Sequence, residues 1–147
     1  MPAPFPHRYK TSIVRTLSSR ARVEAAPRLP ITAGPPPEFD GDATAWSPEH
    51  LLLSAIGTCL LTTFEAFAVR DRVALLAWDA RVTGTVEKTA HGLRFTSYTV
   101  EVDLEVDDVE RARATLDDAK RHCLISHALT LAVEIIPRFT PVARQAG

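Results

Sequence analysis

The sequence of 147 residues has only two cysteines, one methionine and almost no net charge, and it contains no internal repeat or low-complexity segment. A net charge of −1 gives no electrostatic basis for binding nucleic acid or an anionic membrane surface. The first six residues contain no charged stretch followed by an apolar run, so they do not resemble a secretory signal. We therefore expect a cytoplasmic protein, whose thiols are kept reduced and whose residues 1–6 form a flexible lead-in.

Length and composition are those of one soluble globular domain. Hydrophobic residues make up 46% of the chain and charged residues 24%, and a chain of this size can bury a core without disulfides. We therefore expect a single domain over residues 1–147. Residues 51–69 are apolar enough to suggest a membrane span, but Glu65 and four Ser or Thr residues within them argue against it.

A long helix is predicted from residue 48 to about residue 70. Ser47 can accept a backbone N–H as N-cap, Pro48 fits the first helical position, and Glu49 favours the positive end of the helix dipole. The helix is apolar nearly all round, and such a helix must be buried on more than one side. Its polar stripe consists of Ser54, Thr58, Thr62 and Glu65. A dimer in which two copies of this helix pack together would bury the helix on more than one side.

Strands are expected before and after this helix. The predicted strands cover residues 11–16, 20–24, 79–88, 98–106 and 131–136. Residues 89–92 predict a hairpin turn, and a β-bulge near Thr96-Ser97 would reconcile Leu93 and Phe95 with the alternation that follows. Pro137 is expected to end the last strand. An amphipathic helix from Asp108 to Cys123 completes an α+β class.

The two cysteines are the candidate reactive groups. Cys59 lies inside the long apolar helix, and Cys123 is expected on the buried face of the second helix, near its end. A thiol that attacks a peroxide must be a thiolate, and a second thiol can trap the sulfenic acid before over-oxidation. The alternative is two inert core cysteines, since free cysteine is among the most buried residue types.

Glu49 is the candidate acid, but its position on the helix constrains it. It lies ten residues before Cys59, which corresponds to about 15 Å along the helix axis. A glutamate side chain cannot span that distance. If Glu49 acts beside Cys59, either a partner chain supplies it, which we prefer, or the helix bends sharply near Gly57. The alternative role of Glu49 is to stabilise the helix N-terminus.

Several motifs together resemble the OsmC/Ohr family, the osmotically inducible and organic hydroperoxide resistance proteins. The motifs are Phe39-Asp40-Gly41, Ser47-Pro48-Glu49 with Leu52, Cys59 ten residues after the Glu, and Cys123 followed by Ser126 and Leu129. The resemblance covers about residues 8–137. It implies an OsmC-like fold, with antiparallel sheets around a long buried central helix, in an intertwined homodimer.

The resemblance also implies a thiol-dependent peroxidase that reduces organic hydroperoxides to alcohols. Cys59 would be the peroxidatic cysteine and Cys123 the resolving cysteine, with an intrachain disulfide between them. Glu49 would hold an active-site arginine. A dithiol would reduce the disulfide, and in the Ohr branch this reductant is a lipoylated protein. No metal or organic cofactor is implied.

Two positions depart from the family pattern. Leu124 stands where the family usually has proline, which loosens the turn around Cys123 but keeps the thiol. Glu38 stands where some members carry the arginine. Other members carry it in an early loop, which corresponds here to Ser18-Ser19-Arg20. Arg20 is therefore the leading candidate.

Arg22 and Arg28 are the next candidates after Arg20. The alternative for all three arginines is a place on an exposed strand face with no role in the site. His122, Cys123 and His127 do not make a full metal-ligand set, so we expect no metal site.

A small apolar-ligand-binding protein with inert cysteines is the second functional hypothesis, and a hydrolase or transferase that uses Cys59 toward carbon is the third. Thiol reactivity distinguishes them, because a peroxidatic cysteine titrates below about 8.5.

Overall fold

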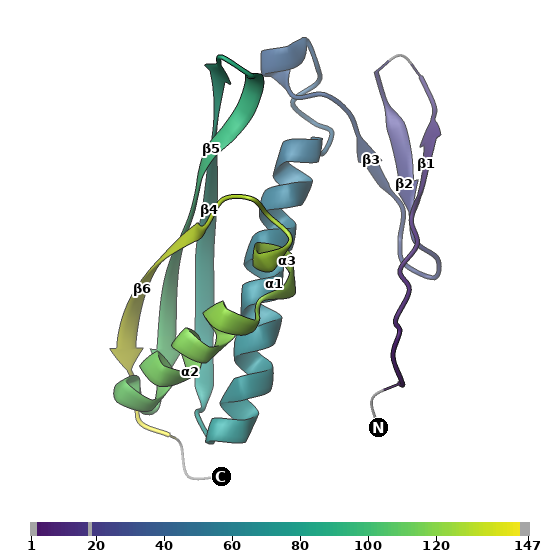
Figure 1. Cartoon of the computed structure of the whole chain (residues 1–147). Coiled ribbons are helices and arrows are strands. Elements are labelled where there is room, and N and C mark those ends of the chain that lie inside the picture. The colour runs from purple at the N-terminus through teal and green to yellow at the C-terminus, as the bar shows by residue number, and fades with distance from the viewer. Residues whose placement is uncertain (1–2, 18, 145–147) are drawn as a thin grey trace. The chain divides into compact units, whose positions relative to one another are not determined.

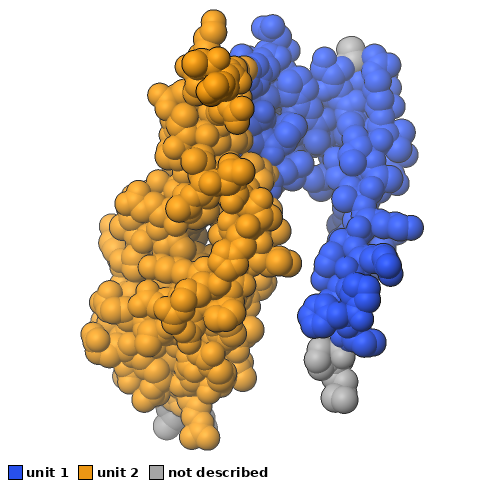
Figure 2. All heavy atoms as spheres, viewed as in Figure 1, with its two compact units in different colours: residues 1–51 blue, residues 52–147 orange. Residues whose placement is uncertain are grey.

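The computed structural model describes residues 3–17 and 19–144, and its elements are labelled in Figure 1. The chain divides into two compact units, Met1–Leu51 and Leu52–Gly147 (Figure 2). Each unit is described by itself below. The expectation of a single domain over residues 1–147 stays a prediction, and residues 1 and 2 of the expected lead-in lie outside the described part of the chain.

The first unit is built on a three-stranded antiparallel sheet in the order β1-β2-β3. The strands are β1 (Ser12–Arg15), β2 (Ala21–Glu24) and β3 (Ile31–Ala33). The first two confirm the extended stretches predicted there, whereas the sequence pattern does not predict β3. A short 3-10 helix, η1 (Pro37–Phe39), follows in the proline-rich connector. A Cβ atom at Gly41 would lie 1.7 Å from the carbonyl oxygen of Pro35, so this close turn requires glycine.

The long helix α1 (Pro48–Asp71) begins and ends where the sequence predicts. The Ser47 hydroxyl accepts the N–H of His50 at 3.1 Å, and the Ser47 carbonyl accepts the N–H of Leu51 at 2.9 Å. These two bonds are the predicted N-cap. By length and composition alone α1 could cross a membrane, a test that the core helix of a soluble protein also passes.

Within this chain, α1 is buried along one stripe only. The fully or nearly fully buried residues of α1 are Ile56, Leu60, Phe64 and Ala68. The predicted polar stripe is exposed, and Val69 is 81% exposed. The expected burial on more than one side is therefore not provided by one copy of the chain.

The second unit contains a three-stranded sheet in the order β4-β5-β6. Its strands are β4 (Leu75–Thr89), β5 (Gly92–Val106) and β6 (Val133–Pro141). β4 and β5 form the predicted hairpin, with Ala90 and His91 in the turn. Thr85 pairs with Ser97 whereas Val86 pairs with Phe95, so Thr96 is the extra residue of the predicted bulge.

Strand β6 corrects two expectations. It pairs with β5 in parallel, so the second sheet is mixed rather than antiparallel. The chain reaches β6 through a crossover that carries α2 (Val109–His122) and α3 (Leu124–His127), which is the kind of connection that parallel pairing needs. β6 also continues past Pro137 instead of ending there. It is an edge strand, where a residue without an N–H is tolerated.

The core of the second unit lies between its helices and one face of the sheet (Figure 1). Asp108 caps α2 by accepting the N–H of Arg111 at 2.9 Å. The core residues of the three elements are Ile56, Leu60 and Phe64 of α1, Val100, Val102, Leu104 and Val106 of β5, and Ala112, Leu116 and Ala119 of α2. These side chains hold α1 and the end of α2 in place, and therefore position the two cysteines.

Candidate dithiol site

The structure brings the two cysteines together within the second unit. Cys59 lies in the middle of α1, half-buried. Cys123 lies between two helices, as the C-cap residue of α2 and the N-cap residue of α3, which confirms the expected position near the end of the second helix. It is 1% exposed. Both thiols are free, and the two side chains lie close enough for each to shift the pKa of the other.

Burial and hydrogen bonding act in opposite directions on the pKa of Cys59. Burial raises the pKa, whereas the backbone N–H groups of Ile125 and Leu124, the Cys123 thiol and the Thr63 hydroxyl lower it. The Thr63 oxygen lies 4.0 Å from the Cys59 sulfur. The hydrogen bonds prevail, and the pKa of Cys59 falls below its ordinary value. A lower pKa enlarges the thiolate fraction, and the thiolate is the nucleophilic form.

The pKa of Cys123 moves the other way. Burial is the main cause and raises it, and the neighbouring Cys59 sulfur raises it further. The hydroxyl and the backbone N–H of Ser126 oppose this rise, and the hydroxyl donates to the Cys123 sulfur at 3.2 Å. The site therefore pairs a thiol whose pKa is lowered with a neighbouring thiol whose pKa is raised.

Glu49 lies in the first turn of α1 and belongs to the first unit, whereas Cys59 belongs to the second. α1 continues as one helix through Gly57, so the sharp bend considered from the sequence is absent. One carboxylate oxygen of Glu49, Oε2, is buried and has no hydrogen-bond partner among the described residues. A buried carboxylate oxygen without a partner is costly. This atom therefore needs a cation or donor that the described part of one chain does not supply.

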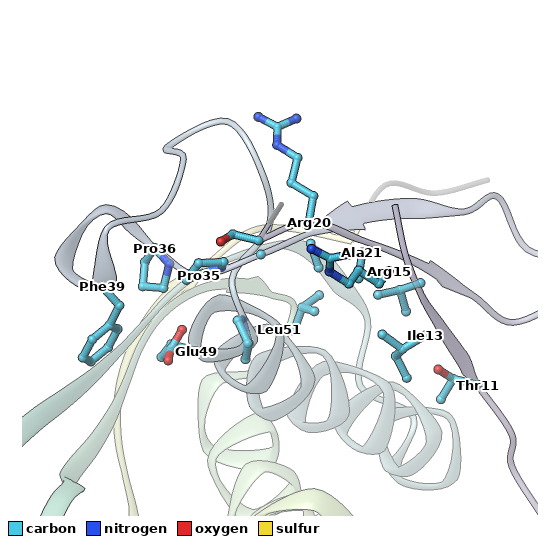
Figure 3. Close-up of a pocket in the computed structure, with 15 residues that line it drawn as sticks. Thr11, Ile13, Arg15, Arg20, Ala21, Pro35, Pro36, Phe39, Glu49 and Leu51 are labelled. Carbon is cyan, nitrogen blue, oxygen red and sulfur yellow. The ribbon is translucent and has the colours of Figure 1, made fainter. Parts of the chain in front are cut away.

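Arg20, the leading arginine, is engaged elsewhere in the first unit. It pairs with Asp42, and its guanidinium lies 3.4 Å from the Thr44 hydroxyl. Its side chain points away from Glu49 in Figure 3. Ser18, at the start of the loop used to select Arg20, lies outside the described residues.

The two other arginine candidates are not beside Glu49 either. Arg22 pairs with Glu24, and Arg28 is exposed. Neither lines the hollow in the first unit that Glu49 lines. The structure therefore gives no ion pair between Glu49 and any arginine that the sequence selected.

Arg15 is the arginine that sequence reasoning did not favour. It lies at the end of β1 and lines an open hollow of about 920 Å³ together with Glu49 (Figure 3). Among the described residues it has no ion pair. The remaining lining is mainly apolar and includes Ile13, Val23, Phe39 and Leu51. Period-2 alternation places Ile13 and Arg15 on one face of a strand, and this signal in the sequence could have selected Arg15.

A metal site, and a histidine that could serve as base for Cys59 in the hydrolase hypothesis, gain no support from residues 3–17 and 19–144. Within them no group of three or more His, Cys, Asp or Glu side chains could hold a metal ion. The His122 ring nitrogen Nδ1 instead lies 2.9 Å from the carbonyl oxygen of Asp118, and the ring packs edge-on against Phe67. The hydrogen-bond partners of Cys59 in this part of the chain include no histidine.

Fold and site together define an α+β protein with two adjacent thiols, one on a long apolar helix and one at a helix–helix junction. The family model for OsmC-like proteins matches residues 40–137. The chain therefore belongs to the OsmC-like family, which confirms the resemblance seen in the sequence motifs.

Solved structures of the same fold cover nearly the whole chain. An OsmC-like protein from Mycoplasma pneumoniae is 17% identical, with a TM-score of 0.78 over 94% of this chain and 99% of that chain. An organic hydroperoxide resistance protein, OsmC, from Legionella pneumophila is 18% identical, with a TM-score of 0.68 over 92% and 99%. The organic hydroperoxide resistance protein OhrB of Bacillus subtilis is 16% identical, with a TM-score of 0.66 over 90% and 98%. A comparison with curated proteins gives no match.

Proposed function

We propose that the protein is a cysteine-based peroxidase that reduces organic hydroperoxides to alcohols. One observation carries the proposal: the Cys59 and Cys123 side chains lie close enough to interact, and the pKa of Cys59 is lowered while that of Cys123 is raised. A nucleophilic thiolate beside a protonated second thiol is what sulfenic acid chemistry needs. Family membership supports it, because relatives of the same fold are named organic hydroperoxide resistance proteins.

The reaction has two steps at the protein. The Cys59 thiolate attacks one oxygen of the hydroperoxide, an S–O bond forms, the O–O bond breaks, and the departing alkoxide takes up a proton to become an alcohol. Sulfur loses two electrons and becomes a sulfenic acid. The Cys123 sulfur then attacks the Cys59 sulfur, the S–O bond breaks, and water leaves with the proton of the Cys123 thiol. The product is the Cys59–Cys123 disulfide.

An external dithiol completes the cycle. It reduces the disulfide by thiol–disulfide exchange, which returns two thiols to the protein and leaves the reductant as a disulfide. A lipoylated protein belongs to this class of reductant. We expect the cycle to run in the cytoplasm, where reducing thiols are abundant.

We propose further that the working form is an intertwined homodimer in which Glu49 of one chain acts beside Cys59 of the other. α1 is apolar nearly all round but buries one stripe, and the Glu49 atom Oε2 lacks a partner. Glu49 would hold a guanidinium through a charge-assisted pair, and that guanidinium would bind the peroxide. Arg15 and Arg20 both line the hollow that Glu49 lines, but Arg20 would first have to leave Asp42.

Mass spectrometry of the reduced protein after one equivalent of cumene hydroperoxide tests the proposed chemistry. We expect a rapid loss of two mass units and a Cys59–Cys123 crosslink. Cys123→Ser should stop at a sulfenic or over-oxidised Cys59, and Cys59→Ser should not react. Thiols that stay unchanged for minutes in the wild-type protein would overturn the peroxidase proposal.

The hollow in the first unit favours a second candidate function, the binding of a small apolar ligand. Its volume of about 920 Å³ and its mainly apolar lining suit such a ligand. Under this alternative the cysteines are inert. Calorimetric titration with a fatty acid distinguishes the two: tight binding by a protein whose thiols ignore the hydroperoxide would favour the binding function.

A further inference from the structure

Cys123, the second thiol of the proposed cycle, has to react in a place that water hardly reaches. It is 1% exposed. Sulfur attacks as a thiolate, and burial penalises a charge that no water solvates. A reactive Cys123 therefore needs a hydrogen-bond donor from the protein.

The Ser126 hydroxyl is placed to be this donor. It donates to the Cys123 sulfur at 3.2 Å. Ser126 lies three residues after Cys123, a spacing that brings two side chains onto one face of a helical turn. The N–H of His127 closes this turn by donating to the Cys123 carbonyl oxygen at 3.1 Å. Both ends of the hydroxyl–sulfur bond are therefore held by one turn of backbone.

The direction of the Ser126 hydroxyl is unusual for a serine in a helical turn. Such a hydroxyl commonly donates to the backbone carbonyl three or four residues earlier. Ser126 donates instead to the side chain three residues earlier, and the acceptor is the sulfur that has to react. The bond therefore acts on the thiol rather than on the helix backbone.

We propose that Ser126 is a catalytic residue of the second step, in which its hydroxyl stabilises negative charge on the Cys123 sulfur. In this step the Cys123 sulfur attacks the Cys59 sulfenic acid, the S–S bond forms and the S–O bond breaks. The leaving hydroxide combines with the proton that Cys123 lost and becomes water. Ser126 keeps its own proton. The inference deepens the proposed function and rests on it, because the stabilised sulfur matters here as the one that forms the disulfide.

The electrostatics of Cys123 agree with this role. Burial raises the pKa of Cys123, and the Ser126 hydroxyl opposes that rise. A hydrogen bond to an anion is stronger than one between neutral groups. Loss of the hydroxyl should therefore raise the pKa of Cys123 further and make its thiolate scarcer at neutral pH.

Single-turnover kinetics test the inference, because they separate the two steps. Reduced protein is mixed with one equivalent of cumene hydroperoxide, and mass spectrometry follows the Cys59 sulfenic acid, trapped with dimedone, and the disulfide over time. We expect Ser126→Ala to form the sulfenic acid at the wild-type rate and the disulfide about tenfold more slowly.

Two further variants are the controls for Ser126→Ala. Ser126→Thr keeps the hydroxyl and should keep most of the rate of disulfide formation. Ser54→Ala removes an exposed hydroxyl from α1 and should change neither step. Equal rates of disulfide formation in wild type and Ser126→Ala would overturn the inference.

The pH dependence distinguishes a donor from a packing role. As the pH rises through the pKa of Cys123, the thiol ionises without help, so the difference between wild type and Ser126→Ala should shrink. A difference that stays constant from neutral to alkaline pH would assign Ser126 to packing of the turn and overturn the inference.

A disulfide reagent separates this inference from the proposed function. Cys59 attacks dithionitrobenzoate and releases one thionitrobenzoate, and Cys123 then attacks the mixed disulfide and releases a second. A slower second release from Ser126→Ala, in a protein that does not consume cumene hydroperoxide, would support the role of Ser126 and overturn the peroxidase. Peroxide consumption with an equal second release from wild type and Ser126→Ala would keep the peroxidase and overturn the role of Ser126.

Discussion

At the scale of single residues, the two ends of α1 carry carboxylates in opposite situations. Asp71, at the C-terminal end, is fully bonded: Arg70 donates to both of its oxygens at 2.6 and 2.8 Å, and the Thr115 hydroxyl donates at 2.8 Å. Glu49, at the N-terminal end, keeps a buried oxygen without a partner among the described residues. A satisfied carboxylate stabilises the fold, whereas an unsatisfied one indicates a site that another group completes.

Asp71 should contribute a pH-dependent part of the stability. Hydrogen bonds from Arg70, and then from Thr115, lower the pKa of Asp71 to about 2. Because the folded pKa lies below the unfolded value of about 3.9, this contribution is complete above that value and is lost as the pH falls toward 2. Urea midpoints of wild type and Asp71→Asn should therefore differ at pH 6 and converge as the pH falls from 4 toward 2.

Glu65→Gln is the control for this prediction, because Glu65 is an exposed carboxylate of the same helix. Its substitution should leave the acid dependence of the wild type unchanged. A gap between wild type and Asp71→Asn that stays constant from pH 6 to pH 2 would contradict the role assigned to Asp71.

At the scale of elements, glycine allows α1 to approach β4 closely. A Cβ atom at Gly57 would lie 2.8 Å from Val82 Cγ2, and one at Gly84 would lie 2.7 Å from Phe95 Cε1 and 2.8 Å from Leu53 Cδ2. All three distances are shorter than side-chain contacts allow. The two glycines therefore set the spacing between the helix that carries Cys59 and the sheet behind it.

Gly84→Val should overpack this layer and destabilise the protein by about 1–3 kcal/mol. Thr83→Val is the control, because Thr83 is the exposed neighbour on the other face of β4, where a change should stay within about 0.5 kcal/mol. Urea unfolding followed by circular dichroism measures both. Equal unfolding free energies for the two variants would contradict the close packing at Gly84.

At the scale of the whole molecule, a second copy of the chain would satisfy two unmet requirements at once. It would cover the half-buried residues of α1 and its exposed Val69. It would also bring Glu49 of one chain beside Cys59 of the other, which lies too far along the same helix for Glu49 to reach. Light scattering should therefore give twice the chain mass of 16.1 kDa.

Mixing two inactive variants tests whether Glu49 acts in the partner's site. In a heterodimer of Glu49→Gln and Cys59→Ser, the Cys59 of the first chain meets the Glu49 of the second, which restores one intact site. Peroxide consumption should therefore rise when the two variants are unfolded, mixed and refolded together. Each variant refolded alone is the control, and a mixture no more active than those controls would place Glu49 in its own chain's site.

Local signals predicted much of the fold because they depend on neighbouring residues. The N-cap at Ser47, the hairpin turn after Thr89 and the bulge at Thr96 each arise from chemistry within a few residues. The parallel pairing of β6 has no such local signal. It depends on where α2 and α3 place the chain after they cross the core, and this is decided by packing.

The features of the candidate site also divide into those that the sequence predicted and those that only the structure showed. Motif spacing by itself selected Cys59, Cys123 and Glu49, because a helix cap and a thiol in an apolar helix are visible in the order of residues. Only the tertiary structure decided that Cys59 and Cys123 lie close enough to interact and that Arg20 pairs with Asp42. Those contacts join residues that are distant in the chain, so they exist only once the core has brought the elements together.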